Sequence, residues 1–224
     1  MTEIVMPPLL VCNLDESGTN KQSPIVTIGG YIAVASAWSD FEVTARSIFN
    51  AYGLGYLHGV EFQNRKPPFN TWSPIKQRTF VTELFDVVRR TVEFGVTFSV
   101  RKDAYLQAKQ VHGRNRNESA YGFAFRGALE HILHDEVVMA ISDYRARLSF
   151  VVESGCANQD DLRRIFEIHK AHPSLTSFMG GLDFADKKSA RCKLQIFSLT
   201  NPDAMSPRVK SVAVTLRCPT FSRS

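Results

Sequence analysis

The chemistry open to this sequence depends first on acidic residues that end apolar strands. Asp15 and Glu16 close the stretch VCNLDESG, and Glu153 closes FVVESG, so an apolar run followed by acid, Ser and Gly occurs twice. Clustered carboxylates repel one another unless a cation or a proton compensates their charge. The repeated pattern therefore raises the hypothesis that two strands deliver carboxylates to one place.

A third acid lies in a segment with loop character. Glu61 is part of LHGVEF and follows His58 by three residues. Mg²⁺ and Mn²⁺ prefer oxygen ligands, and two such ions held by carboxylates can activate water and stabilise the leaving oxygen of a phosphodiester. Asp15, Glu61 and Glu153 are the candidate metal ligands. If they share ions, their carboxylates should converge within about 8 Å, because paired metals sit roughly 3.5–4 Å apart.

The same residues also have an ordinary structural explanation. An acid before Ser-Gly is a common turn in which the carboxylate accepts backbone N–H bonds. A single histidine such as His58 is more often packed or at the surface than a metal ligand. The nucleophile motif Gly-x-Ser-x-Gly, the zinc-binding motif His-Glu-x-x-His and the phosphate-binding Walker loop are absent from the sequence. Both explanations of the acids stay open at this point.

The overall composition indicates a globular domain and sets few limits on partners. Of the 224 residues, 44% are hydrophobic and 22% are charged, as in ordinary globular proteins. No apolar run approaches the ~20 residues of a membrane span, and no basic segment precedes the apolar N-terminus, so we expect a cytoplasmic protein without membrane contact. The net charge of +5 leaves a nucleic-acid partner open, although more than half of the excess lies in residues 196–224.

The periodicity of apolar residues predicts a mixed α/β domain with parallel and antiparallel pairing. Residues 54–72 and 104–118 have the composition of loops, and Gly29-Gly30 indicates a bulge or a close approach of backbone. The first half of the chain is expected to form a strand hairpin at 9–36, a helix from Ser39 to Gly53, a helix from Pro74 capped by Ser73, and a strand at 94–103. The second half is expected to form a helix at about 119–140, a strand at 147–154, a helix capped by Asn158, and a short strand in LTSFMGGLDF.

The motifs, taken in order, resemble a known family. DESG after a first strand, GGYIAVAS in the second, LHGVE in a loop, VVESG on a late strand, and then DKKS and LQ resemble the domain-of-unknown-function family numbered 3800. The resemblance implies a ribonuclease-H-like fold with an acidic two-metal site. The positions that match the family's motifs are Asp15 with Glu16, His58 and Glu61, Glu153, Lys187 or Lys188, and Gln195.

The resemblance ends before the last acidic position of the family. The family continues Leu-Gln-x-Ala-Asp, whereas this chain places Ser198 where that aspartate is expected. Residues 196–224 contain three prolines and many Ser and Thr, and only VKSVAVTL in this tail has the pattern of a strand. We therefore divide the chain into a domain at 1–195 and an atypical tail at 196–224, and we hypothesise a frameshift as the cause of the tail.

The resemblance implies a divalent-metal-dependent nuclease that hydrolyses phosphodiesters. Asp15 and Glu153 would bind Mg²⁺ or Mn²⁺, and Glu61 would be a third ligand or would orient water. His58 would contact a phosphate or transfer a proton, and Lys188 would neutralise a phosphate. The alternative is a ribonuclease-H-like module that is catalytically impaired and serves binding or regulation, which the loss of the last acid favours.

Overall fold

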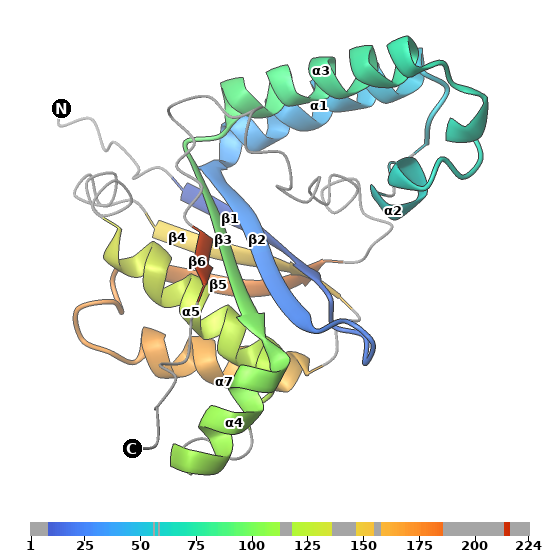
Figure 1. Cartoon of the computed structure of the whole chain (residues 1–224). Coiled ribbons are helices and arrows are strands. Elements are labelled where there is room, and N and C mark those ends of the chain that lie inside the picture. Colours follow the sequence, from blue (N-terminus) through green and yellow to red (C-terminus); the bar gives the residue numbers. More distant parts are fainter. Residues whose placement is uncertain are drawn as a thin grey trace, which may run out of the picture.

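The structure is a computed structural model that describes most of the chain (Figure 1). The described residues are 9–55, 57, 59–112, 118–135, 147–154, 158–185 and 213–215. Of the predicted site residues, His58 and Lys188 lie outside these ranges, as do Lys187, Gln195 and Ser198. Asp15, Glu16, Glu61 and Glu153 lie within them.

Helices and strands are interspersed along the chain, as expected of an α/β domain. The elements are β1 (Leu9–Ser17), β2 (Ile25–Val34), α1 (Ala35–Ala51), α2 (Gly59–Gln63), the 3₁₀ turn η1 (Phe69–Thr71), α3 (Pro74–Thr91), β3 (Phe94–Arg101), α4 (Lys102–His112), α5 (Ala120–His134), β4 (Arg147–Glu153), α7 (Gln159–Lys170), β5 (Met179–Ala185) and β6 (Ala213–Thr215).

The described strands form one mixed sheet in the order β5-β4-β1-β2-β3-β6. β1, β2 and β3 pair antiparallel in succession, whereas β4 is parallel to both β1 and β5. The predicted α/β class and the N-terminal hairpin are confirmed. The three-residue β6 pairs with β3, so part of the expected tail joins the sheet of the domain.

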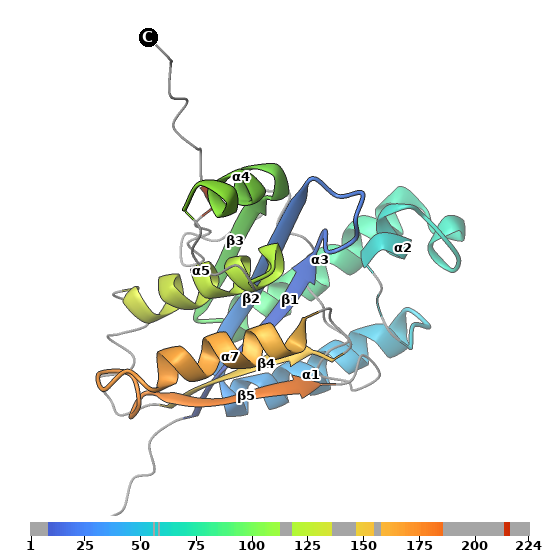
Figure 2. The ribbon, with the colours of Figure 1, turned by 90° about the horizontal axis from the view of Figure 1, so that it is seen from below.

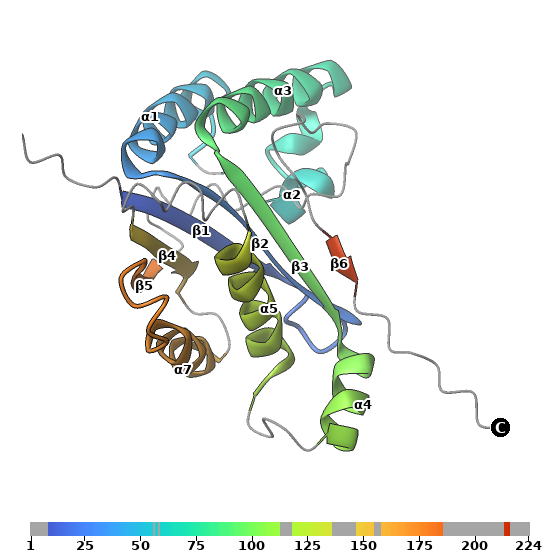
Figure 3. The same ribbon diagram turned by 90° about the vertical axis from the view of Figure 1, so that its left-hand side faces the viewer.

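The two faces of the sheet differ in polarity. On one face Leu10, Cys12 and Leu14 of β1 are buried in a large apolar core to which α5 and α7 contribute. Figures 2 and 3 show α5 and α7 on this side of the strands and α1 with α3 beyond the other side. Because side chains alternate along a strand, the opposite face carries the intervening residues, which are largely polar or glycine.

Helices α1 and α3 pack against each other around a second apolar core. This core is rich in aromatic rings: the centroid of Tyr52 lies 5.0 Å from that of Phe80, and the ring of Trp72 lies 5.4 Å from Phe80. Trp38 at the start of α1 donates its indole N–H to the carbonyl of Val11 in β1 at 2.9 Å. The helix pair is thereby tied to the middle of the sheet.

Two helix starts differ from the sequence expectation for a local reason. α1 begins at Ala35, so Ser39, the expected cap, lies inside the helix, where its hydroxyl donates to the carbonyl of Ala35 at 3.3 Å. Asn158 does occupy the cap position of α7, but with a left-handed backbone (φ 70°) and no side-chain cap bond. Ser73 caps α3 as predicted, accepting a hydrogen bond from the N–H of Lys76 at 3.2 Å.

The two predicted loops are partly helical. Residues 104–112 belong to α4. This helix is polar in composition but makes an aromatic contact: the ring centroid of Tyr105 lies 5.4 Å from that of Phe123 in α5. The segment 54–72 contains α2 and η1, where Phe62 packs on Phe69 with ring centroids 5.1 Å apart. In both places tertiary packing stabilises a helix that local composition does not indicate. No helix in the described ranges has the length and hydrophobicity of a membrane span.

A polar cluster connects α4, α5 and α7 at one end of the apolar core. Asp161 of α7 accepts hydrogen bonds from the N–H of Ser119 at 2.7 Å and from its hydroxyl at 2.8 Å, and pairs with Arg164. The neighbouring Glu118 is buried and pairs with Arg126 of α5. Burial alone would raise the pKa of the Asp161 carboxyl, but the hydrogen bonds from Ser119 and Arg164 outweigh it and hold that pKa below its ordinary value.

We expect Asp161→Asn to lower the free energy of unfolding by about 1–3 kcal/mol near neutral pH, because it weakens hydrogen bonds to a charged group. The pKa of Asp161 is lower in the folded chain than in the unfolded chain. Its stabilisation is therefore complete above the unfolded-state pKa and is lost as the pH falls through the folded-state pKa. Urea denaturation of both proteins should show the difference shrinking as the pH is lowered into that range.

The matched control is Asp160→Asn, which removes an exposed acid at the adjacent position of α7. We expect it to change the free energy of unfolding by no more than about 0.5 kcal/mol. Equal losses in the two variants would show that the hydrogen bonds to Ser119 do not stabilise the fold.

Candidate functional site

Asp15 and Glu16 lie at the end of β1, on opposite faces of the sheet. Pairing with β2 continues without a bulge through both residues, so their side chains alternate. Glu16 is on the face of the large apolar core, where its Oε2 accepts a hydrogen bond from the hydroxyl of Tyr121 at 2.7 Å. Asp15 is on the polar face. The structure therefore separates the two adjacent acids that the sequence analysis grouped.

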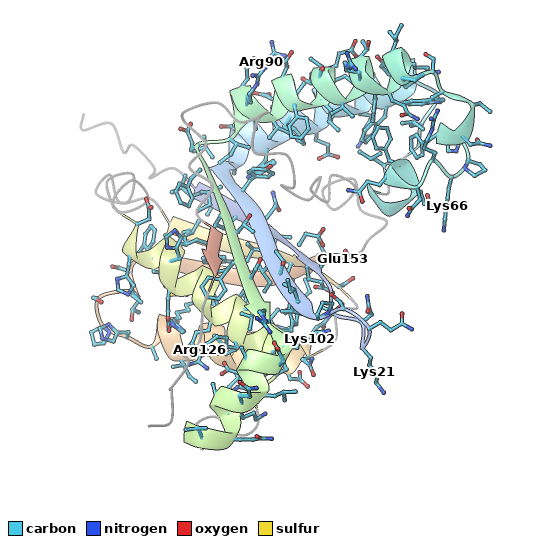
Figure 4. The ribbon with its side chains drawn as sticks, viewed as in Figure 1. Lys21, Lys66, Arg90, Lys102, Arg126 and Glu153 are labelled. Carbon is cyan, nitrogen blue, oxygen red and sulfur yellow. The ribbon has the colours of Figure 1, made fainter. Side chains whose placement is uncertain are left out.

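Glu153 ends β4, the parallel neighbour of β1 (Figure 4). The register pairs Leu14 with Val152, so continuing it by one residue places Asp15 beside Glu153 on the same face. Neighbouring strands are about 4.8 Å apart. Glu153 is only 5% exposed, whereas Asp15 is partly buried. Two carboxylate positions from distant parts of the sequence thus lie side by side at the carboxyl ends of adjacent parallel strands.

A transverse row of residues extends from this pair across the polar face. Gly29 of β2 pairs with Asp15, and Thr97 of β3 pairs with Gly29. On the other side, Ala185 of β5 pairs with Glu153. The strand neighbours of this pair that lie on the row therefore have a small side chain (Ala185) or none (Gly29).

Glu61 does not belong to this row. It is half-buried on α2, and α2 lies near the far ends of α1 and α3, where Phe62 contributes to the second apolar core (Figure 1). Within the described ranges, no three His, Cys, Asp or Glu side chains are grouped so that they could hold a metal ion. The described residues therefore provide Asp15 and Glu153 without the expected third ligand.

A pair of carboxylates suits one hydrated divalent cation better than two. Mg²⁺ commonly keeps several waters and binds to proteins through one or two carboxylates. Two ions about 3.5–4 Å apart need further ligands to offset their mutual repulsion. From the described residues, the donor set of Asp15 and Glu153 fits a single Mg²⁺ or Mn²⁺.

Two other titratable groups near the middle of the sheet remain uncharged at neutral pH. Tyr31 lies two residues after Gly29 on the polar face, and burial raises its pKa to about 12. Cys12 points into the apolar core, is free, and has its pKa raised by burial. Neither supplies an anion or a thiolate to the carboxylate pair.

No protein-family model matches this chain, and neither a curated protein nor a solved structure matches it. Of the residues on the transverse row, sequence analysis identified Asp15 and Glu153 from the repeated acid-Ser-Gly ending. It missed Thr97, whose position beside Gly29 depends on the register between β2 and β3.

The two adjacent glycines of β2 have different tolerances for a side chain, which tests the geometry of the row. A Cβ on Gly30 would lie 2.3 Å from the carbonyl oxygen of Asn13 and 2.6 Å from Leu14 Cδ2. A Cβ on Gly29 would come no closer than 3.4 Å to an atom of the described residues outside its chain neighbours. We expect Gly30→Ala to lower the free energy of unfolding by about 1–3 kcal/mol through overpacking.

Gly29→Ala is the matched control in the same strand, and we expect it to change stability by less than Gly30→Ala. Guanidinium denaturation measures both variants. A larger loss for Gly29→Ala would mean that the register beside Asp15 differs from the one described here.

Proposed function

We propose that this chain is a ribonuclease-H-like, divalent-metal-dependent nuclease with its centre at Asp15 and Glu153. The observation that carries the proposal is the placement of these two carboxylates on adjacent parallel strands and on one face of the sheet. The helix-flanked mixed sheet with an N-terminal hairpin supports the ribonuclease-H-like fold that the sequence motifs imply.

In this proposal Asp15 and Glu153 bind one hydrated Mg²⁺ or Mn²⁺. A divalent ion at this position would supply a Lewis acid that lowers the pKa of water and stabilises the oxygens of a phosphodiester. The carboxylates fix the position of the ion, and the low exposure of Glu153 limits competing hydration of its charge. Glu61, His58 and Lys188 stay candidates for orienting water, transferring a proton and neutralising phosphate.

Cations near this end of the sheet favour a phosphate-containing substrate. Lys21 is exposed in the hairpin loop that follows β1, and Lys102 at the start of α4 donates to the carbonyl of Asn20 in the same loop at 2.5 Å. Figure 4 shows both lysines towards the same end of the strands as Glu153. Such a grouping can attract a nucleic-acid backbone by long-range electrostatics.

A second candidate function is a binding or regulatory module that keeps the fold without efficient catalysis. Two observations favour it. The described residues contain no group of three potential metal ligands, and the last acidic position of the family pattern is Ser198 in this sequence. Fewer carboxylates lower the affinity of a site for divalent cations.

The nuclease proposal is tested by removing each carboxylate charge at nearly constant shape. We expect Asp15→Asn and Glu153→Gln to weaken Mn²⁺ binding at least about tenfold, since even residues that only support metal ligands contribute that much. Cleavage of labelled RNA and DNA, in single and double strands, should fall in parallel. Isothermal titration calorimetry gives the Kd, and gel assays with and without a chelator give the activity.

The control variant is Asp40→Asn, which removes an exposed acid from α1 and should leave Kd and cleavage unchanged. Chelator-sensitive cleavage that survives both site substitutions would refute the proposed centre. Metal binding that depends on Asp15, combined with nucleic-acid binding but no cleavage of any substrate, would instead support the binding module.

A further inference from the structure

A buried hydroxyl lies on the same transverse row as Asp15. In the described part of the chain, Thr97 Oγ1 is shielded from solvent and has no hydrogen-bond partner. Leaving a buried polar group unsatisfied is costly, so native proteins usually provide such a group with a protein or water partner. The Thr97 hydroxyl, on the row of the proposed metal centre, therefore needs a partner.

A neighbouring pair of residues on β2 and β3 shows what kind of side chain could give the Thr97 hydroxyl a hydrogen-bond partner. Two residues away, Thr27 of β2 faces Ser99 of β3, and their hydroxyl oxygens are 2.9 Å apart in a hydrogen bond. Thr97 faces Gly29, which offers no side chain. The same sheet thus pairs its hydroxyls in one row and omits the partner in the row that contains Asp15.

The omitted side chain leaves space on the side of Asp15. A Cβ on Gly29 would be 3.4 Å from Thr97 Oγ1, and among the described residues outside its chain neighbours the only other atom within 4 Å is the carbonyl oxygen of Val96. No atom of Asp15 comes within that distance. The position above Gly29 therefore lies between the hydroxyl of Thr97 on β3 and the strand β1, which carries Asp15.

We propose that a water molecule held above Gly29 connects the hydroxyl of Thr97 to the carboxylate of Asp15, which makes Thr97 a positioning residue for the metal centre. Buried waters typically join about two to four polar groups that otherwise lack partners. Asp15 Oδ1 accepts the N–H of Glu16 at 2.8 Å, and a water-mediated bond from Thr97 would further restrain the rotation of the carboxylate. The effect on metal binding rests on the proposed function, whereas the bridging water does not.

The direct test is a high-resolution crystal structure of the metal-free full chain. We expect an ordered oxygen above Gly29 within hydrogen-bonding distance of both Thr97 Oγ1 and the Asp15 carboxylate. Absence of that oxygen, or a protein acceptor for Thr97, would overturn the inference whatever the chain catalyses.

The functional test uses Thr97→Val, which removes the hydroxyl at constant shape, and Gly29→Ala, which fills the space. Both should weaken Mn²⁺ binding about tenfold in calorimetry, as expected for a group that orients a metal ligand. Thr97→Ser should restore the wild-type Kd, and this rescue distinguishes positioning from packing. Ser99→Ala, which removes a satisfied hydroxyl of the same strand, is the matched control and should leave Kd unchanged.

The outcomes separate this inference from the proposed function. If Asp15→Asn weakens Mn²⁺ binding but Thr97→Val and Gly29→Ala do not, the inference is wrong and the metal centre stands. If Thr97→Val only raises stability, the hydroxyl is unsatisfied in solution too and the inference is wrong. If Asp15→Asn leaves Mn²⁺ binding unchanged, the proposed function fails, and the crystallographic oxygen alone decides the bridge.

Discussion

The strict alternation of β1 between two unlike neighbours is the constraint on which the rest of the structure depends. β1 is antiparallel to β2 on one side and parallel to β4 on the other, with no bulge in either described register. A slip of one residue would exchange the faces of Leu10, Cys12 and Leu14 with those of the polar positions between them. The buried core beneath α5 and α7 therefore fixes, at the same time, the face on which Asp15 lies.

The same register gives the polar face its chemical character. Parallel pairing places the carboxyl ends of β1 and β4 at the same edge of the sheet. The acids that end the two strands therefore lie near each other, although they are far apart in the sequence. Like charges that lie close together are unfavourable unless a cation or a proton compensates them. On the apolar face, Glu16 has a structural role instead: it accepts a hydrogen bond from Tyr121, which joins β1 to α5.

The sequence predicted those helices and strands whose formation depends on residues that are neighbours in the chain. Alternation predicted the hairpin and the late strand, and the Ser73-Pro74 pair predicted the start of α3, because these depend on neighbours in the chain. It was uninformative for α4, which is stabilised partly by the contact of Tyr105 with a helix distant in sequence. The opposite faces of Asp15 and Glu16 follow from alternation alone, but the adjacency of Thr97 and Gly29 does not, because register between strands is a property of the whole sheet.

Because the two apolar cores are separate, the parts of the fold that they stabilise can unfold locally and independently of each other. Among the described residues, the core between α1 and α3 shares none with the core between the sheet and α5. Proteins built in this way open in cooperative parts, each with its own free energy, which amide hydrogen exchange resolves. We expect the α1–α3 pair, together with the segment that carries Glu61, to form such a part. Its transient opening would move Glu61 while Asp15 and Glu153 stay anchored in the sheet.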